Sequence, residues 1–274
     1  RSVIEGERTH LSPPARAALS TAYYDLISKI LSISISSHLS IVGTQQVPGL
    51  TMVTVGHSTA SDIALKLNEL PPSSLLKVKL GSADDVQTLE LIGSLDGRPM
   101  FLDANQGWTS VDQALKAIEV AGEDRVVGME QPFGKDRWDL HVELRKLTKV
   151  PIYADESIQV LTDLERAPEA FDGVNLKLMK CGGLDRAIMM AMRAQEFGLK
   201  VMLGSMSESS LGCGAMAHLA GIADLVDLDG PWLIKNDPFE GLGLEDERLV
   251  LKGTVGVGVE LRSGLDLDWN HIGA

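Results

Sequence analysis

Charged side chains recur through the middle of this 274-residue sequence at intervals of about 25 residues. Each follows an apolar, β-branched run, as expected where a strand ends. The members, in chain order, are Lys77, Lys79, Asp103, Glu130, Asp155, Lys177, Asp227 and Asp229. In a repeating strand–helix fold, the carboxyl ends of parallel strands meet at one edge of the sheet. The spacing therefore predicts that these side chains converge on one site.

Three of these residues are acids on consecutive predicted strands: Asp103, Glu130 and Asp155. Converging carboxylates repel one another unless they are protonated or neutralised by a cation. Ligands that are all oxygen suit Mg²⁺, with Mn²⁺ as a substitute, better than zinc. A single aspartate is usually a loop acid or a helix cap. Three acids in register favour a metal site.

Lys79 and Lys177 lie on the second and sixth predicted strands, which face each other across a closed eight-stranded barrel. A lysine among apolar neighbours is costly unless it has a partner or a task. It could pair with the same acids. Beside a divalent cation and Lys77, however, the pKa of a lysine falls, which favours general base chemistry. Lys77 precedes Lys79 by two residues, so both can face the lumen.

Asp227 and Asp229 also alternate by two, on the expected last strand. Two acids there would attract a positive group such as a substrate ammonium, while a second metal site or plain loop acids remain alternatives. Ser205 lies near the end of the seventh predicted strand and is a further candidate for substrate binding. His218 falls in a small-residue helix pattern, which favours a packed or surface residue over a base.

Eight strands are needed to position these residues. The predicted strands are Thr51–Gly56, Leu75–Gly81, Met100–Asn105, Val126–Pro132, Val150–Ser157, Val174–Lys180, Lys200–Met206 and Leu225–Gly230. Most segments between them have helical periodicity, and strands that alternate with helices pair in parallel. This pattern predicts an α/β fold, a (β/α)8 barrel of the TIM type, over residues 49–274. An open doubly wound sheet is the alternative, but the sequence lacks its glycine-rich phosphate-binding turns.

Residues 1–48 do not fit the barrel pattern. Ser12-Pro13-Pro14 is typical of a helix start, and Ala15–Ile30 is helical in character. Leu31–Val42 is ambiguous between strand and loop. We expect residues 1–48 to be the end of a second, α+β domain, with the last segment of the chain packing back on it.

Composition limits the partners. The net charge of −13, from 25 basic and 38 acidic residues, argues against binding nucleic acid. No apolar run approaches the roughly 20 residues of a membrane span, and the N-terminus lacks a secretory signal. Cys181 and Cys213 lack metal-site spacing and indicate reduced thiols. We expect a cytoplasmic homo-oligomer that acts on a small molecule.

Five motifs together resemble the enolase superfamily, muconate-lactonising subgroup. They are Lys77-Val78-Lys79, Asp103-Ala104-Asn105, Glu130-Gln131-Pro132, Ala154-Asp155-Glu156-Ser157 and Lys177-Leu178-Met179-Lys180-Cys181-Gly182-Gly183. With Asp227-Leu228-Asp229, the chain is most similar to dipeptide epimerases of the L-Ala-D/L-Glu type. The resemblance covers essentially the whole chain from Ser12 onward.

The resemblance implies a two-base 1,1-proton transfer at the α-carbon of a dipeptide through an enediolate. Asp103, Glu130 and Asp155 would hold Mg²⁺, and Lys79 and Lys177 would be the two acid/base groups. Lys77 would add positive charge near the substrate carboxylate. The aspartates Asp227 and Asp229 would bind its α-ammonium.

It also implies a capping domain over the barrel mouth that contributes to substrate specificity, of which residues 1–48 would be the end. Alternatives within the subgroup are a cycloisomerase, an o-succinylbenzoate synthase and an N-acylamino-acid racemase, whose substrates offer no ammonium to Asp227 and Asp229. A non-catalytic barrel that binds a partner is a further alternative, although it would be expected to have lost a lysine or an acid of the set.

Overall fold

Eight parallel strands in chain order form the centre of the computed structural model, which describes residues 11–40, 51–56, 59–70 and 73–265. The strands are β1 (Val53–Val55), β2 (Leu76–Lys79), β3 (Met100–Asp103), β4 (Val126–Glu130), β5 (Ile152–Ala154), β6 (Gly173–Lys177), β7 (Lys200–Gly204) and β8 (Leu225–Asp227). Thr51 forms a parallel bridge with Val226, and Met52 N donates to Val226 O at 3.0 Å. The last strand thus meets the first, and the predicted (β/α)8 barrel is confirmed.

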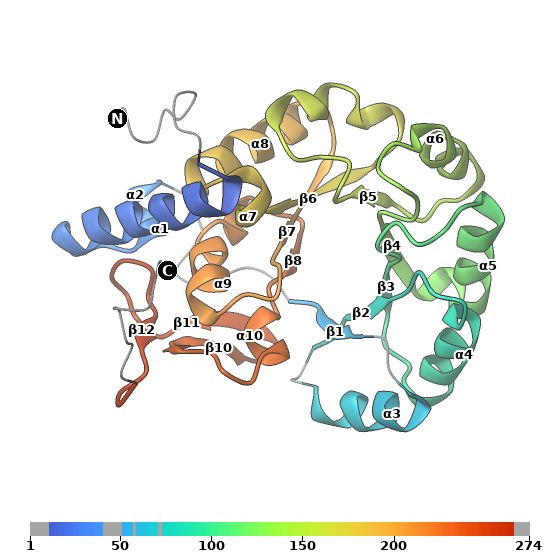
Figure 1. Ribbon diagram of the computed structural model, residues 1–274, viewed down its shortest axis with the longest axis horizontal. Coiled ribbons are helices and arrows are strands. Elements are labelled where there is room, and N and C mark those ends of the chain that lie inside the picture. The colour runs from blue at the N-terminus through green and yellow to red at the C-terminus, as the bar shows by residue number, and fades with distance from the viewer. Residues whose placement is uncertain (1–10, 41–50, 57–58, 71–72, 266–274) are drawn as a thin grey trace.

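Helices surround the strands (Figure 1). They are α3 (Ala60–Glu69), α4 (Asp85–Leu95), α5 (Val111–Ala121), α6 (Trp138–Leu147), α7 (Leu178–Cys181), α8 (Leu184–Glu196), α9 (Ser210–Ala217) and α10 (Gly230–Leu233). Three short 3₁₀ segments, Glu123–Arg125, Leu161–Glu165 and Ala167–Glu169, precede β4 and β6, and a fourth, Ala220–Ile222, precedes β8. The start of α5 follows the sequence pattern, because Ser110 precedes it and Gln113 Oε1 accepts the Ser110 N–H at 3.2 Å.

A layer of four large side chains fills the barrel interior on the amino-terminal side of the charged strand ends. Met52, Phe101, Tyr153 and Met202 are buried together and come from alternate strands or their edges. The rings of Phe101 and Tyr153 lie 5.3 Å apart between centroids, at 64° to each other. The intervening strands carry Gly128 and Gly173, where a Cβ would collide with these rings. Interleaved large and small residues of this kind close a barrel core.

All eight predicted strands extend past the carboxyl ends of the observed strands, and two of them run into helices. Val174–Lys180 was expected to be extended, but β6 ends at Lys177 and the next four residues form α7. Leu225–Gly230 was likewise too long, because β8 ends at Asp227 and Pro231 lies in the first turn of α10. The neighbouring strand β7 ends at Gly204, so no ladder partner extends either strand. Asp229 therefore lies after β8, not on it.

The N-terminal helices α1 (Pro13–Ile30) and α2 (Ile35–His38) lie on the same side of the molecule as the C-terminal segment (Figure 1). Ile35 N donates to Gly256 O at 3.0 Å, and Val257 N donates to Asp25 Oδ1 at 2.8 Å. The helix expected after Ser12 is confirmed, and α2 resolves part of the ambiguous segment, whose residues 41 and 42 lie outside the described residues.

The C-terminal segment forms two antiparallel pairs rather than barrel strands. These are β9 (Phe239–Glu240) with β12 (Glu260–Leu261), and β10 (Leu242–Glu245) with β11 (Arg248–Leu251). His218 is buried against this segment, with Nε2 3.1 Å from Val257 O and Nδ1 accepting Ser36 N–H at 3.3 Å. Its burial and two backbone contacts give it a packing role.

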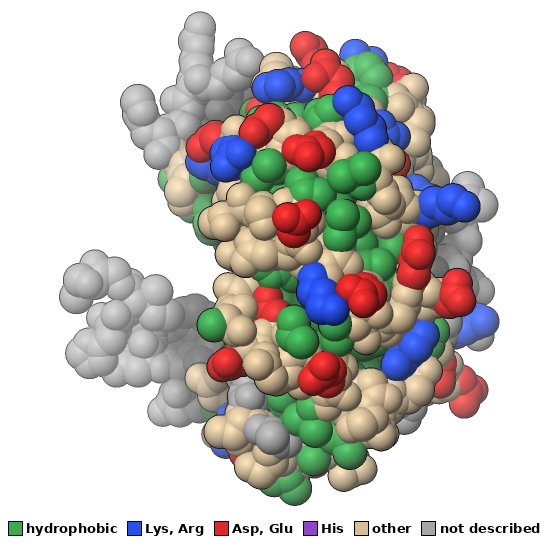
Figure 2. Space-filling view, turned by 90° about the vertical axis from the view of Figure 1, so that its right-hand side faces the viewer, with side chains coloured by type: hydrophobic (Ala, Val, Ile, Leu, Met, Phe, Trp, Pro, Cys, Tyr) green, Lys and Arg blue, Asp and Glu red, His purple; other side chains and the backbone are tan. Residues whose placement is uncertain are grey.

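The outer face formed by the helices on the right of Figure 1 mixes acidic, basic and apolar side chains (Figure 2). Acidic and basic groups lie side by side there rather than in separate fields. Within the described part of the chain, no helix is long and apolar enough to cross a membrane.

Candidate active site

Five predicted site residues are the last residues of their strands. They are Lys79, Asp103, Glu130, Lys177 and Asp227. The strand register pairs Lys79 with Asp103 and Asp103 with Glu130. Two further predicted residues, Asp155 and Ser205, directly follow β5 and β7. The carboxyl end of the barrel thus brings the predicted acids and lysines together.

Lys77 is at the centre of this group. Its side chain is only 2% exposed, and its Nζ lies 2.6 Å from Glu130 Oε2, 2.6 Å from Asp227 Oδ2 and 3.0 Å from Asp103 Oδ2. Asn175 Nδ2 donates to the other oxygen of Glu130 at 2.6 Å. Inside the barrel, Lys77 thus connects acids from three strands: Asp103 of β3, Glu130 of β4 and Asp227 of β8.

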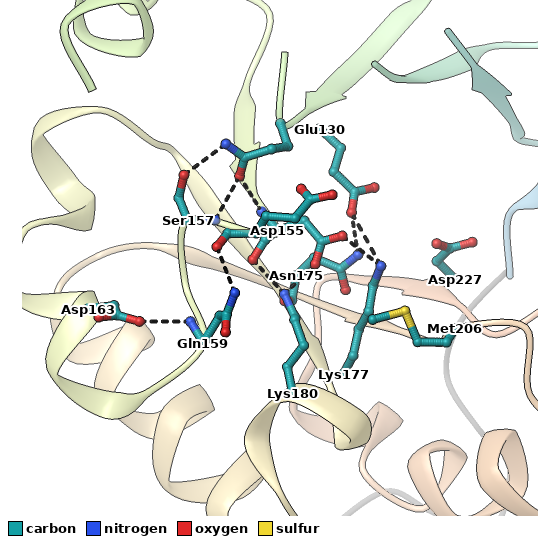
Figure 3. A network of polar contacts seen from close by, with 12 residues as sticks. Glu130, Asp155, Ser157, Gln159, Asp163, Asn175, Lys177, Lys180, Met206 and Asp227 are labelled. Carbon is teal, nitrogen blue, oxygen red and sulfur yellow. Dashed lines mark hydrogen bonds and ion pairs between the residues drawn. The ribbon is translucent and has the colours of Figure 1, made fainter. Parts of the chain in front are cut away.

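The two predicted base lysines each contact one acid. Lys79 Nζ lies 2.6 Å from Asp103 Oδ2, and Lys177 Nζ lies 2.7 Å from Asp155 Oδ2. The Lys79 side chain is 28% exposed and that of Lys177 is 6% exposed. Figure 3 shows Lys177 between Asp155 and Asp227, beside Met206. Because β2 and β6 are four strands apart in an eight-stranded barrel, the two amines approach the mouth from opposite sides.

Three polar residues of the site were not given roles from the sequence. Asn175 is fully buried beside Glu130, and Lys180 binds Asp155 from α7. Gln131 takes a left-handed backbone conformation, with φ 36°, and its Oε1 accepts from Asp155 N and Ser157 N. Asn175 had a usable signal, since it lies two residues before Lys177 and so faces the same side of the strand.

Asp229 lies beside β1 rather than on β8. Its Oδ2 accepts Thr54 N–H at 2.6 Å, and the residue is buried. Asp227 keeps one buried oxygen, Oδ1, with no hydrogen-bond partner among the described residues. Ser205 Oγ faces Asp227 O at 3.5 Å, and Ser205 N donates to the same carbonyl at 3.1 Å. Ser205 thus holds the ends of β7 and β8 together.

The acids differ in protonation because their neighbours differ. Burial would raise the pKa of Asp103, but Lys77 and Lys79 outweigh it and lower the pKa to about 2. Lys180 and Lys177 likewise lower the pKa of Asp155 against its burial. Burial and the charge of Asp103 raise the pKa of Glu130 to about 7. Glu130 is therefore the acid of this group whose charge most needs a cation.

The lysines respond in the opposite sense. Burial opposes the charge of Lys177, but Asp155 and Glu130 outweigh it and raise the pKa of Lys177. The pKa of Lys77 is raised well above its ordinary value for the same kind of reason, with Asp103, Asp227 and Glu130 as neighbours. The lowered lysine pKa expected from the sequence assumed a nearby cation, and the carboxylates by themselves act the other way.

The donor set fits a hard cation, although the side chains are not arranged as a cage. Asp103, Glu130 and Asp155 offer only oxygen, and Glu130 Oε2 is buried with an ion pair but no well-directed hydrogen bond. Within the described residues, no three His, Cys, Asp or Glu side chains already converge enough to hold a metal ion. Each of these three carboxylates contacts a lysine ammonium.

Two surface clefts lie away from these side chains. One, of about 510 Å³, is lined by α6, the segments before β5 and β6, and the first residue of β7, at the opposite end of the barrel. The other, of about 690 Å³, lies between α1, α7, α9 and the C-terminal strands. The candidate site therefore rests on the chemistry and geometry of its side chains rather than on the size of a cleft.

The chain is similar to proteins of one known family. Residues 73–264 match the family described as Enolase C-terminal domain-like. This match covers more than half of the chain, and the chain therefore belongs to this family.

Several individual relatives and solved structures are similar to this chain over most of its length. The chain is 36% identical over 248 residues to the L-Ala-D/L-Glu epimerase of Bacteroides thetaiotaomicron, covering 89% of this chain and 64% of that protein. It thus spans less than two thirds of that relative. A dipeptide epimerase from Methylococcus capsulatus, solved with a Mg ion, superposes with a TM-score of 0.84 at 31% identity, covering 95% of this chain and 79% of the other. One from Cytophaga hutchinsonii, solved with Mg and D-Ala-L-Val, superposes with a TM-score of 0.83 at 25% identity, covering 93% and 72%.

Proposed function

We propose that this protein is a Mg²⁺-dependent epimerase that moves a proton on and off the α-carbon of a dipeptide. The observation that carries the proposal is the placement of Lys79 and Lys177 at the ends of β2 and β6, with acids between them. The similarity to relatives named as dipeptide epimerases, two of them solved with Mg, supports the substrate class and the metal.

Asp103, Glu130 and Asp155 would hold the Mg²⁺. When bound, the cation would offset the second negative charge that builds on the substrate carboxylate as the α-proton leaves. A lysine base combined with Mg²⁺ is the known pattern of the enolase superfamily. Mn²⁺ would be expected to substitute, because the ligands are all oxygen.

The chain's own residues would carry the proton. One lysine of the pair removes the α-proton from one face of the substrate, and the other returns a proton to the opposite face, which inverts the centre. Lys79 and Lys177 would exchange these parts between the two epimers. Asp229 and the free oxygen of Asp227 would bind the α-ammonium, since both lie in a buried acidic corner. Lys77 would keep the acids around it charged.

The same proposal covers substrate specificity, the division of the chain into domains, the oligomeric state and the cellular location. Residues 1–48 would belong to a capping domain that contributes to specificity, with residues 49–274 as the barrel. Ser205 would act through the end of β8 and so shape the ammonium site. We also infer a cytoplasmic homo-oligomer.

Proton NMR in D₂O tests the function directly. The protein is mixed with Mg²⁺ and a panel of dipeptides, and the α-proton signals are followed. Loss of one α-signal while the other diastereomer grows is the expected result. Turnover of N-acyl amino acids or cyclohexadiene acids, with no exchange on any dipeptide, would refute dipeptide epimerisation and favour a neighbouring activity.

A further inference from the structure

Two lysines of β6 and α7 share one acid. Lys177 contacts Asp155 Oδ2 at 2.7 Å, and Lys180, three residues later, contacts Asp155 Oδ1. Figure 3 shows the two amines approaching Asp155 from different directions. From the sequence, Lys177 was selected as a base and Lys180 was assigned no role, and the other contacts of the two lysines differ.

Lys180 has no hydrogen-bond donor left for a substrate. A lysine ammonium has three N–H donors. Lys180 Nζ contacts Asp155 Oδ1, Asp155 O at 2.6 Å and Asn175 O at 2.9 Å, and its side chain is only 9% exposed. Lys177 Nζ has one close contact among the described residues, Asp155, with Glu130 Oε1 next at 4.0 Å. Lys177 can therefore reach a ligand, whereas Lys180 is committed to the protein.

The contacts of Lys180 lie where the pairing of β5 with β6 ends, although β6 continues to pair with β7 as far as Lys177. The β5–β6 ladder ends with the pair Ala154 and Val174. The two carbonyls that Lys180 binds belong to the residues after this pair, Asp155 directly after β5 and Asn175 within β6. The ammonium thus joins the two strands one residue beyond their last regular pair. These are the segments from which the Asp155 and Lys177 side chains leave the barrel wall.

We propose that Lys180 is a positioning residue that fixes the orientation of Asp155 and the end of β6, and so aims Lys177 at the substrate. The proposal rests on the function proposed above. Outer partners that orient a metal-binding side chain commonly change metal affinity or activity by about 10–100-fold when they are removed. Lys180 would act through Asp155 and Lys177 without touching the substrate.

A purely electrostatic role predicts a different result. If Lys180 only supplied a countercharge to Asp155, its removal would leave the site more negative, and Mg²⁺ would bind more tightly. If Lys180 orients the carboxylate, its removal weakens Mg²⁺ binding. The sign of the change in affinity separates the two roles.

The test compares Lys180→Met, which keeps the length and removes the charge, with Lys180→Arg, which keeps donors and charge. Lys116→Met is the matched control, because Lys116 lies on α5 and pairs with Glu119 on the surface. Isothermal titration calorimetry measures Mg²⁺ affinity without substrate. We expect the dissociation constant of Lys180→Met to rise about 10–100-fold, most of the affinity to return in Lys180→Arg, and no change in the control.

A second measurement compares α-proton exchange on the two faces of the substrate α-carbon. In D₂O, Lys180→Met should slow α-proton exchange far more for the diastereomer that presents its proton to Lys177 than for the other. Unchanged or tighter Mg²⁺ binding, or equal slowing of both diastereomers, overturns the proposal. If Lys180→Met does not fold, Lys180→Gln is measured under the same criteria. A wild-type protein that turns over no dipeptide refutes the proposed function, while the Mg²⁺ titrations still decide the role of Lys180.

Discussion

Replacing Lys77 by methionine should destabilise the fold strongly, because one buried ammonium serves three buried acids. Asp103 would keep Lys79 at 2.6 Å, and Glu130 would keep Asn175 at 2.6 Å. Asp227 has no other ion-pair partner among the described residues. Removing one partner from a buried ion pair typically costs about 3–5 kcal/mol. For a chain of this size we expect the melting temperature to fall by roughly 6–20 °C.

The loss should depend on pH through Glu130. The pKa of Glu130 is raised from 4.5 to about 7, so its contribution to stability is fully present below pH 4.5 and is lost as the pH rises through 7. Lys77 opposes that shift, and its removal raises the pKa of Glu130 further. Protonated Glu130 needs no cation, so Lys77→Met should cost less stability at pH 5 than at pH 8.

Urea unfolding followed by tryptophan fluorescence at pH 5 and pH 8 measures both effects. Lys116→Met is the control, because the Lys116 side chain is 53% exposed and a surface change of this kind should stay within about 0.5 kcal/mol. A loss below about 1 kcal/mol at pH 8 in Lys77→Met, or an equal loss at both pH values, would show that Lys77 is not the counterion of these acids.

Three further predictions concern the site. Lys79→Ala and Lys177→Ala should each abolish epimerisation in the NMR assay while retaining α-proton exchange of opposite diastereomers; full activity of both contradicts two-base catalysis. Burial and Asp227 raise the pKa of Asp229 to about 6, so kcat/KM for dipeptides should fall below pH 6 as Asp229 loses the charge that we propose binds the substrate ammonium. That pH dependence should vanish in Asp229→Asn, and its persistence there would assign it to another group. In Gly204→Ala the new Cβ meets the buried Asn175 amide, which should cost about 1–3 kcal/mol in urea unfolding, and an unchanged midpoint would contradict this packing.

The strand–helix period was readable from the sequence because it is local. Apolar runs of four to seven residues, each ending in a charged residue, mark β2, β3, β4 and β6 within a few residues of their observed bounds. The ends of the strands were predicted less accurately than their existence and order. Asp229 looked like a strand residue by alternation, yet the strand ends two residues earlier, because the length of a parallel strand depends on its neighbour as well as on its own sequence.

Inside the barrel, too, the sequence predicted some features and the tertiary structure decided others. The sequence indicated that Lys77, Lys79 and Lys177 lie near acids, since all occupy strand ends. Alternation places Asn175 on the same face as Lys177, but it does not reveal the close packing by which the Asn175 side chain fits against Gly204, which has no Cβ, on the next strand. From the sequence, Lys177 was selected as a base and Lys180 was assigned no role, but the difference between their contacts could not be predicted. That difference depends on backbone carbonyls of two strands meeting one ammonium.

The sequence by itself determined the class of fold, the height at which the charged groups emerge and the choice of acids and lysines, because periodicity and residue type are properties of the chain. Only the tertiary structure decided which charges pair. It placed Lys77 among three acids from three other strands and assigned two lysines to Asp155. The strength of ion pairing depends on distance and burial. Both quantities are fixed only when strands far apart in the chain close into a barrel.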